Sequence, residues 1–264
     1  MPDVIVQAKG LKKEFGGVIA VNNVSFDVLR QEIYAVIGPN GAGKTTLFNL
    51  LSGVYVPESG SLEFEGKTLG KAMPHQRAAL GMSRTFQNLQ LFTNMTVLEN
   101  VMVGRHTKSR AGLIEAALRL PTAGREERQI RERALQALEL VGLTQRADRM
   151  VGYLSFGQQR LVEIARAVAT EPKLLLLDEP GAGLMRKEIE ALDELVRKLR
   201  ADGMTVILVE HNMELVMGIA DRLMVLDYGM KIAEGTPLQV QQDARVIAAY
   251  LGAETFTAMP ASEG

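Results

Sequence analysis

Gly38-Pro39-Asn40-Gly41-Ala42-Gly43-Lys44-Thr45-Thr46 is the stretch around which the rest of the chain is organised. It matches the pattern G-x-x-x-x-G-K-[ST], in which glycines let successive backbone N–H groups turn toward a polyphosphate. An apolar run at residues 33–37 precedes it and is typical of a buried strand, and residues 47–51 continue after it at helical spacing. Because a strand and a helix flank the loop, we interpret it as a nucleotide-binding loop rather than as a glycine-rich turn that matches by accident.

The residues of this loop have separate expected tasks. The helix that follows would point its positive end at the phosphates, and Lys44 would reach the outer phosphates as a point charge. Thr45 supplies a hydroxyl for Mg²⁺. The predicted nucleotide contacts are Gly38, Pro39, Asn40, Gly41, Ala42, Gly43, Lys44, Thr45 and Thr46.

The composition is that of an ordinary globular protein. The 264 residues are 47% hydrophobic and 23% charged, and the net charge is −1, so no field over the whole molecule attracts nucleic acid or an anionic membrane. The absence of cysteine excludes disulfides and thiolate metal sites and suits a reducing cytosol. The N-terminus lacks the features of a signal peptide, and the apolar runs are too short to span a bilayer. We therefore expect any membrane role to come through a partner.

The N-terminal part predicts antiparallel strands. Residues 4–9 and 24–29 alternate apolar and polar side chains as half-exposed strands do, and residues 62–65 form another short strand. The turn Phe15-Gly16-Gly17 lies between the first two. Phe15 is either a core residue of the hairpin or a flat ring for adenine, since base–aromatic stacking contributes roughly 1–3 kcal/mol. We favour the adenine contact.

The middle of the chain predicts helices. Residues 74–80 are expected to form a short helix, and residues 81–87 lead into irregular chain. Thr96 followed by Glu99 forms a capping box. The segment 105–133 is densely charged and is interrupted by Pro121 and Gly124. The part from Arg125 to Leu140 has helical spacing, and we interpret the charged segment as a solvated helix face rather than a contact for a partner or for lipid headgroups.

Two further stretches predict polar groups at one edge of a parallel sheet. Ser155 precedes a helical run as an N-cap, which presents another helix N-terminus that can face an anion. The uniformly apolar strand 174–177 is followed by Asp178 and Glu179, and the strand 205–209 is followed by Glu210-His211. Such strands are buried on both faces, and ligands bind at their carboxyl ends. Residues 223–226 and 231–233 complete the predicted sheet.

Together these stretches resemble the ATPase subunit of an ABC transporter, from about residue 4 to residue 252. The motifs of the family occur in order: the phosphate loop at 38–45, the glutamine loop at Gln87, the signature at 154–158 (LSFGQ), the magnesium acid Asp178 followed by Glu179, and the switch histidine His211. The resemblance implies an α/β fold with a P-loop NTPase core, in which helices flank a mostly parallel sheet. It also implies an N-terminal antiparallel β subdomain and an inserted α-helical subdomain.

The expected domain limits follow from the same resemblance. One ABC ATPase domain would cover residues 1–254, with a flexible tail at 255–264. Within it, the RecA-like core would comprise about 1–87 and 160–240, and the helical subdomain about 88–159.

The chain is most similar to one branch of the family, the importers of branched-chain amino acids. The similarity rests on the phrases RTFQN at 84–88 and MTVLEN at 95–100, on the insert 105–133, and on the ending AYLG at 249–252. Importers of amides or urea share much of this wording and remain an alternative.

Two residues depart from the family pattern. Phe156 replaces the usual signature glycine, and we expect this position to be tolerant because the implied phosphate contacts belong to its neighbours. Met185 replaces a usual acid or amide in the loop 181–185, which bears on communication between the two ATP sites.

The resemblance implies ATP hydrolysis with magnesium. The groups that would act on the ion or its waters are Thr45, Gln87 and Asp178, and Gln87 also counts among the catalytic residues. Glu179 would orient and deprotonate the attacking water, and Lys44 and His211 would stabilise charge on the γ-phosphate.

The resemblance also implies partners. Ser155, Gly157 and Gln158 would close in trans over ATP held by a second ATPase subunit, in a homodimer or a heterodimer. Membrane permease subunits seated near Gln87 and Glu99 would hold the dimer at the cytoplasmic face of the inner membrane, and a substrate-binding protein would act indirectly.

Two rival interpretations come from other classes. A soluble ABC ATPase acting on nucleic acid or the ribosome would usually carry two cassettes or a coiled coil and a basic surface, and this chain has one cassette and no such surface, so we expect no nucleic-acid partner. A P-loop kinase would need an acceptor site and would have no use for the signature at 154–158.

Overall fold

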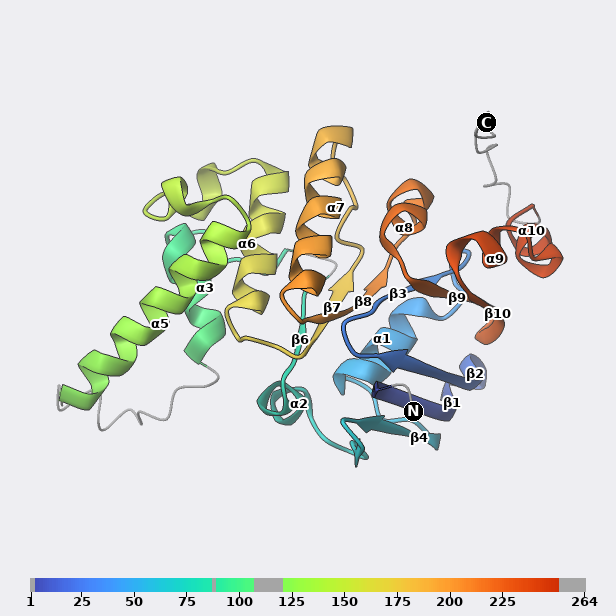
Figure 1. Ribbon diagram of the computed structural model, residues 1–264. Helices are drawn as coiled ribbons and strands as arrows, with labels where there is room; N and C mark the ends of the chain where they lie inside the picture. The colour runs from blue at the N-terminus through green and yellow to red at the C-terminus, as the bar shows by residue number, and fades with distance from the viewer. Residues whose placement is uncertain (1–2, 87–88, 107–120, 252–264) are drawn as a thin grey trace.

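The structure is a computed structural model that describes residues 3–86, 89–106 and 121–251 (Figure 1). Gln87, the segment 107–120 within the charged insert and the tail at 255–264 lie outside the described residues. What the sequence predicts for these residues stays a prediction.

Six strands of the described chain form the central sheet: β3 Ile33–Ile37, β6 Met82–Arg84, β7 Leu174–Asp178, β8 Thr205–Val209, β9 Arg222–Asp227 and β10 Met230–Gly235. Their order is β10-β9-β3-β8-β7-β6, and all neighbours are parallel except β10 and β9. Every residue of β3, β7 and β8 is buried, which explains why these strands are unbroken apolar runs in the sequence.

Four further strands in the described ranges form an antiparallel sheet: β1 Val4–Phe15, β2 Val18–Leu29, β4 Ser59–Phe64 and β5 Lys67–Thr68, in the order β2-β1-β4-β5. β1 and β2 extend well beyond the predicted ranges 4–9 and 24–29 and meet at the two-residue turn Gly16-Gly17. Both glycines have positive φ angles, 53° and 87°, as a tight hairpin turn requires.

The helices of the described chain are α1 Lys44–Ser52, α2 Pro74–Leu80, α3 Val97–His106, α5 Pro121–Leu140, α6 Phe156–Val168, α7 Arg186–Ala201, α8 Met213–Ile219, α9 Pro237–Gln241 and α10 Ala244–Leu251. None of them combines the length and the apolar character that a membrane span requires. The predicted capping box of α3 is confirmed, because the Glu99 amide donates to Thr96 Oγ1 at 3.2 Å and the Thr96 amide donates to Glu99 Oε2 at 2.8 Å.

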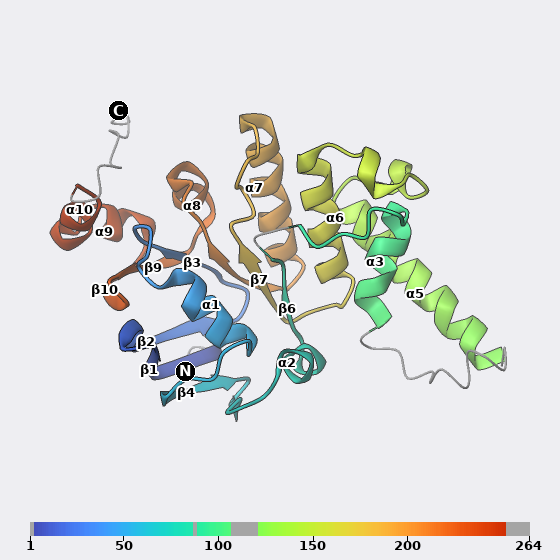
Figure 2. The same cartoon turned by 180° about the vertical axis from the view of Figure 1, so that it is seen from behind.

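The parallel strands separate two hydrophobic cores. Ala35 and Leu175 belong to the buried cluster that includes residues of α6, α7 and α8, whereas Tyr34 and Leu176 belong to the cluster of α1 and the antiparallel sheet. Figure 1 shows these layers on opposite sides of the central sheet, with α3 and α5 beyond α6 at one end, and Figure 2 shows the same arrangement from behind.

Two local features of the structure were not predicted from the sequence. Residues 82–84 form β6, a short edge strand that pairs with Leu174–Leu176 of β7. α5 begins at Pro121 and continues through Gly124, although the sequence indicated helical spacing only from Arg125. Proline is compatible with the first helical position because the N–H that it lacks would have no partner there.

Candidate nucleotide site

The glycine-rich loop connects the end of β3 to the start of α1. A Cβ at Gly38 would collide with the backbone oxygen of Leu226, and a Cβ at Gly43 would collide with that of Ala20. Gly43 also has a φ of 99°, in the left-handed region, and forms the N-cap of α1. Other residues therefore do not fit these two positions, and the loop packs tightly against β9 and β2.

Lys44 lies inside this loop. Its side chain is only 5% exposed, and Nζ donates to the carbonyl oxygens of Gly38 and Pro39 at 2.7 Å and 2.8 Å. Burial lowers the pKa of Lys44, while the Glu179 carboxylate acts in the opposite direction. The ammonium group is thus held by the loop itself, within the electrostatic reach of Glu179.

Asp178 ends β7 and is 1% exposed. Its Oδ2 contacts Arg84 Nη2 at 2.7 Å, and its backbone N–H donates to Thr85 Oγ1 at 3.3 Å. Within the described part of the chain, its Oδ1 is buried and has no hydrogen-bond partner. A buried carboxylate oxygen left available at the carboxyl end of a parallel strand fits a hard cation such as Mg²⁺ or one of its waters.

The sequence did not predict a role for Arg84, which joins Asp178 to α1 through its guanidinium group. Besides Asp178, its Nη1 donates to Asn49 Oδ1 and to Ser52 Oγ of α1, both at 2.7 Å. The guanidinium also lies 5.8 Å from the centre of the Phe48 ring. Its spacing in the sequence carries no signal for these contacts, which join three separate segments.

Glu179 and His211 come together as the sequence predicts for two groups that follow neighbouring parallel strands. His211 Nε2 lies 3.0 Å from Glu179 Oε1. Glu179 has a φ of 48°, a left-handed conformation that is uncommon for a residue with a side chain, and its backbone N–H donates to Val209 O at 2.9 Å. The carboxylate is therefore held at the edge of the sheet, beside Asp178.

Phe15 ends β1 at the tip of the hairpin. The ring is 42% exposed and rests with its edge against Tyr55, with ring centroids 5.1 Å apart. Lys13 Nζ lies 5.1 Å from the ring centroid. The ring is therefore not a buried core residue of the hairpin, and the adenine contact stays a prediction.

The signature forms the N-terminus of α6. The Gln158 amide donates to Ser155 Oγ at 3.3 Å and the Ser155 amide donates to Gln158 Oε1 at 3.2 Å, so Ser155 is the predicted N-cap. Gly157 is buried, and a Cβ there would collide with the Glu188 carboxylate of α7. Figures 1 and 2 show α6 and α1, the helices that follow the signature and the phosphate loop, on opposite sides of β7.

The two residues that depart from the family pattern lie in neighbouring segments. The ring of Phe156 lies against Gly183, whose Cβ would be 3.1 Å from a ring carbon. The Arg160 guanidinium lies 5.8 Å from the centre of the same ring. Met185, two residues after Gly183, is exposed.

A groove with a volume of about 470 Å³ borders the segment that leads to Gln87. Phe86 and Phe92 contribute exposed aromatic rings to its lining. The Phe86 backbone is fixed by the buried pair of Arg160 and Glu163: its N–H donates to Glu163 Oε1 at 3.2 Å, and its carbonyl accepts from Arg160 Nη1 at 3.0 Å.

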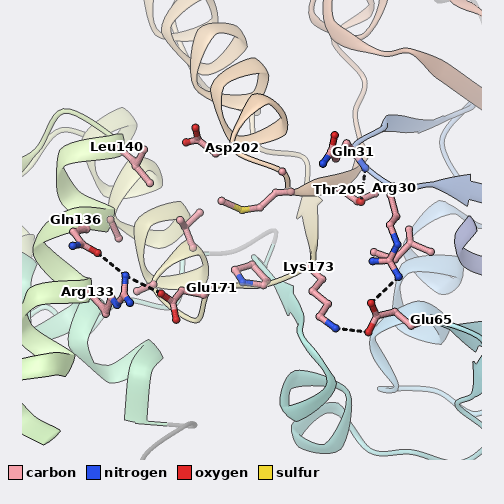
Figure 3. Close-up of a pocket in the computed structure, with 17 residues that line it drawn as sticks. Arg30, Gln31, Glu65, Arg133, Gln136, Leu140, Glu171, Lys173, Asp202 and Thr205 are labelled. Atoms are coloured by element: carbon pink, nitrogen blue, oxygen red, sulfur yellow. Dashed lines mark hydrogen bonds and ion pairs between the residues drawn. The ribbon is translucent and has the colours of Figure 1, made fainter. Parts of the chain in front are cut away.

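A second cavity, of about 680 Å³, lies at the opposite edge of the central sheet, where Lys173 precedes β7 and Thr205 begins β8 (Figure 3). Five of the charged residues that line it form pairs with one another: Glu65 contacts Arg30 at 2.8 Å and Lys173 at 2.5 Å, and Arg133 contacts Glu171 at 3.1 Å. None of the predicted site residues lines this cavity.

For the remaining predicted nucleotide contacts the structure gives only their position and exposure, so their roles stay predictions. Thr45 lies exposed in the first turn of α1, and Thr46 is half-buried beside it. Asn40 and Gly41 are exposed at the outer side of the loop, and together with Pro39 and Ala42 they line a third cavity, which Arg245 of α10 also borders.

Comparison with protein families gives two matches. The family described as ABC transporter matches residues 21–182. The family described as branched-chain amino acid ATP-binding cassette transporter matches residues 230–255.

Among individual proteins, the high-affinity branched-chain amino acid transport ATP-binding protein LivG of Escherichia coli is 44% identical over 253 residues, which cover 96% of this chain and 99% of that protein. The corresponding protein BraF of Pseudomonas aeruginosa is 44% identical over 249 residues, which cover 94% and 98%.

Solved structures give the same result for the fold. The ADP conformation of an ATP-binding cassette of an ABC transporter matches with a TM-score of 0.83 and 34% identity, over 94% of this chain and 99% of that chain. A dimeric post-hydrolysis cassette bound to ADP and Pi matches with a TM-score of 0.74 and 27% identity, over 88% and 99%. The predicted P-loop NTPase fold is thereby confirmed.

Proposed function

The chain belongs to the ABC transporter family, whose cassettes are ATPases that power transport, and we propose that it drives a membrane importer of branched-chain amino acids. The observation that carries the ATP-hydrolysis part of this proposal is the cluster of Lys44, Asp178, Glu179 and His211 at the carboxyl ends of β3, β7 and β8. The substrate class rests on the C-terminal family match and on the names of the full-length relatives.

The residues of this cluster divide the work of hydrolysis between them. Glu179 is placed to orient a water molecule and accept its proton, since it lies at the sheet edge with one oxygen directed at His211. Lys44 and His211 would compensate charge that spreads over the γ-phosphate in the transition state.

Thr45, Asp178 and Gln87 are the residues that would hold magnesium or its waters, and the free Oδ1 of Asp178 supports this assignment. When bound, the ion would neutralise phosphate charge. Arg84 occupies the other oxygen of Asp178 and thereby fixes the direction of the carboxylate.

We further propose that two chains share each ATP. The helices that follow the phosphate loop and the signature, α1 and α6, lie on opposite sides of the central sheet, and the similarity to a dimeric cassette supports a second copy or a related subunit as the source of the signature. Ser155 Oγ and the N-terminus of α6 would then face the γ-phosphate of the partner's ATP.

Permease subunits are the proposed membrane partners, which would place the chain at the cytoplasmic face of the inner membrane. The groove beside Phe86 and Phe92 supports a docking place for them, because it exposes aromatic rings next to the segment that leads to Gln87. The division into a core at 1–87 and 160–240 and a helical subdomain at 88–159 belongs to the same proposal.

Reconstitution tests the substrate class. The chain would be purified with its permease subunits, placed in vesicles with their binding protein, and assayed for ATP hydrolysis. Leucine, isoleucine or valine should stimulate hydrolysis, and a Glu179→Gln assembly should show no stimulation. Stimulation by urea or a short amide alone would contradict the assignment and favour the related importers.

A further inference from the structure

Glu210 is a buried carboxylate that contacts no cationic side chain within the described part of the chain. It follows β8, is 2% exposed, and accepts three backbone N–H groups. The other buried carboxylates of the described chain, Glu32, Glu163 and Asp178, each contact an arginine. Burial raises the pKa of Glu210, and the three N–H donors act in the opposite direction. Because a buried charge costs free energy unless it is compensated, we infer that Glu210 has a role in the site beyond stabilising the fold.

The three donors come from two loops. Gly181, two residues after Glu179, donates to Oε1 at 2.5 Å. His211 and Asn212 donate to Oε2 at 3.0 Å and 3.2 Å. One carboxylate therefore joins the loop that follows β7 to the loop that follows β8.

Hydrogen bonds hold the backbone at Glu179 and, two residues later, at Gly181. The Glu179 N–H is fixed to Val209 O at 2.9 Å, and the Gly181 N–H is fixed to Glu210. Between them Glu179 adopts its left-handed φ of 48°, which costs of order 1–3 kcal/mol unless the surroundings hold it. If one of these two hydrogen bonds is lost, the loop can relax to a more common backbone conformation, which would move the Glu179 carboxylate.

We propose that Glu210 is a positioning residue for ATP hydrolysis, which holds Glu179 and His211 in register through the backbones of the two loops. The inference rests on the proposed roles of Glu179 and His211. It predicts that Glu210 affects the rate of the chemical step and leaves the affinity for ATP nearly unchanged, because it does not lie among the predicted nucleotide contacts.

The first test is Glu210→Gln, which keeps the shape but replaces one acceptor oxygen by an NH₂ group that cannot accept an N–H. We expect kcat to fall about 10–100-fold, since a displacement of about 1 Å at a catalytic group can cost that much. KM for ATP should change less than about threefold, because uniform binding is preserved.

Glu32→Gln is the matched control. Glu32 is also buried, accepts the Leu29 N–H at 2.7 Å and has its pKa raised by burial, but it lies at the opposite edge of the sheet beside Arg222. It should lower the melting temperature while kcat of the folded protein stays unchanged. An equal loss of kcat in Glu32→Gln would show that any buried glutamate has this effect.

Gly181→Ala tests the junction from the other side and keeps the charge. The new Cβ would lie 2.9 Å from Glu210 Oε1, so the carboxylate must move away. We expect a similar loss of kcat, and the double variant should lose no more than the stronger single variant. If Glu210→Gln does not fold, Gly181→Ala alone decides. Unchanged kcat, or losses that multiply in the double variant, would overturn the proposal.

Failure of the proposed function would look different. In that case Glu179→Gln would hydrolyse ATP at the normal rate, whatever Glu210→Gln does. If Glu179→Gln hydrolyses ATP slowly while Glu210→Gln hydrolyses it at the normal rate, only the positioning role of Glu210 is refuted.

Discussion

Replacing Arg84 with methionine should lower the free energy of unfolding by about 3–5 kcal/mol, the cost of removing one partner of a buried ion pair. The guanidinium is the only cation in contact with Asp178 in the described part of the chain, at 2.7 Å, and Asp178 is 1% exposed. Methionine preserves much of the apolar stem, so the loss reports mainly the uncompensated carboxylate and the lost bonds to Asn49 and Ser52.

The assay is equilibrium unfolding in urea without nucleotide, in a double-mutant cycle with Asp178→Asn. The double variant should lose about 0.5–3 kcal/mol less unfolding free energy than the two single variants lose together, because the asparagine leaves no buried charge behind. Arg186→Met is the control: Arg186 pairs with Glu190 at 3.5 Å on an exposed helix face, and the unfolding midpoint should not move. A loss below about 1 kcal/mol for Arg84→Met, or strictly additive losses, would refute the reasoning.

Three further outcomes follow from the site. Lys44→Ala should abolish ATP hydrolysis and weaken binding of a fluorescent ATP analogue, because the loop loses the ammonium that Gly38 and Pro39 now hold; near-normal hydrolysis would contradict the site. Phe15→Ala should weaken ATP binding by about 1–3 kcal/mol in calorimetry while turnover at saturating ATP stays close to normal, and unchanged affinity would exclude the adenine contact. Glu179→Gln should bind ATP, hydrolyse it very slowly and become dimeric in light scattering when ATP is added; turnover at the normal rate would place the base elsewhere.

The sequence predicted the parts of the site that follow regular elements. Asp178, Glu179 and His211 come directly after fully buried strands, so their meeting at one sheet edge follows from parallel pairing. Ser155 could be identified as an N-cap because a polar residue stands immediately before an apolar helical repeat.

The extent of the first two strands could not be predicted because their pairing is irregular. The register of β1 and β2 shifts between Ala8 and Leu11, where Gly10 has a φ of 59°, and Asn23 of β2 has a φ of 52°. Each bulge changes which side chains face inward, so the alternation that identifies a strand breaks at residue 9 and resumes near residue 24.

The roles of Arg84 and Glu210 also escaped prediction. Arg84 acts on a residue 94 positions away in the chain, and Gly181 lies 29 positions from Glu210. A single arginine or glutamate in a sequence carries no periodicity, so only the packed structure reveals such contacts. β6 was missed for a related reason, since its three residues form a strand only because β7 offers an edge.

The central claim is that each ATP lies between the phosphate loop of one chain and the signature of another. Tethered dimers in the Glu179→Gln background test it, with Lys44→Ala in one half and Ser155→Asp in the other. Aspartate also caps helices but adds a negative charge toward the γ-phosphate, whereas a side chain at Gly157 would strike Glu188 within its own chain. Ser155→Asn, which caps without a charge, is the matched control: a tethered dimer with Ser155→Asn in both halves should retain more ATP than one with Ser155→Asp in both halves.

The deciding measurement is the number of ATP molecules that each tethered dimer retains after gel filtration. A shared site predicts one ATP in the mixed dimer, because one site carries both defects and the other carries neither, and two ATP molecules in the tethered parent. If each site were built within a single chain, both sites of the mixed dimer would be defective. No retained ATP in the mixed dimer, beside two in the parent, would contradict the account.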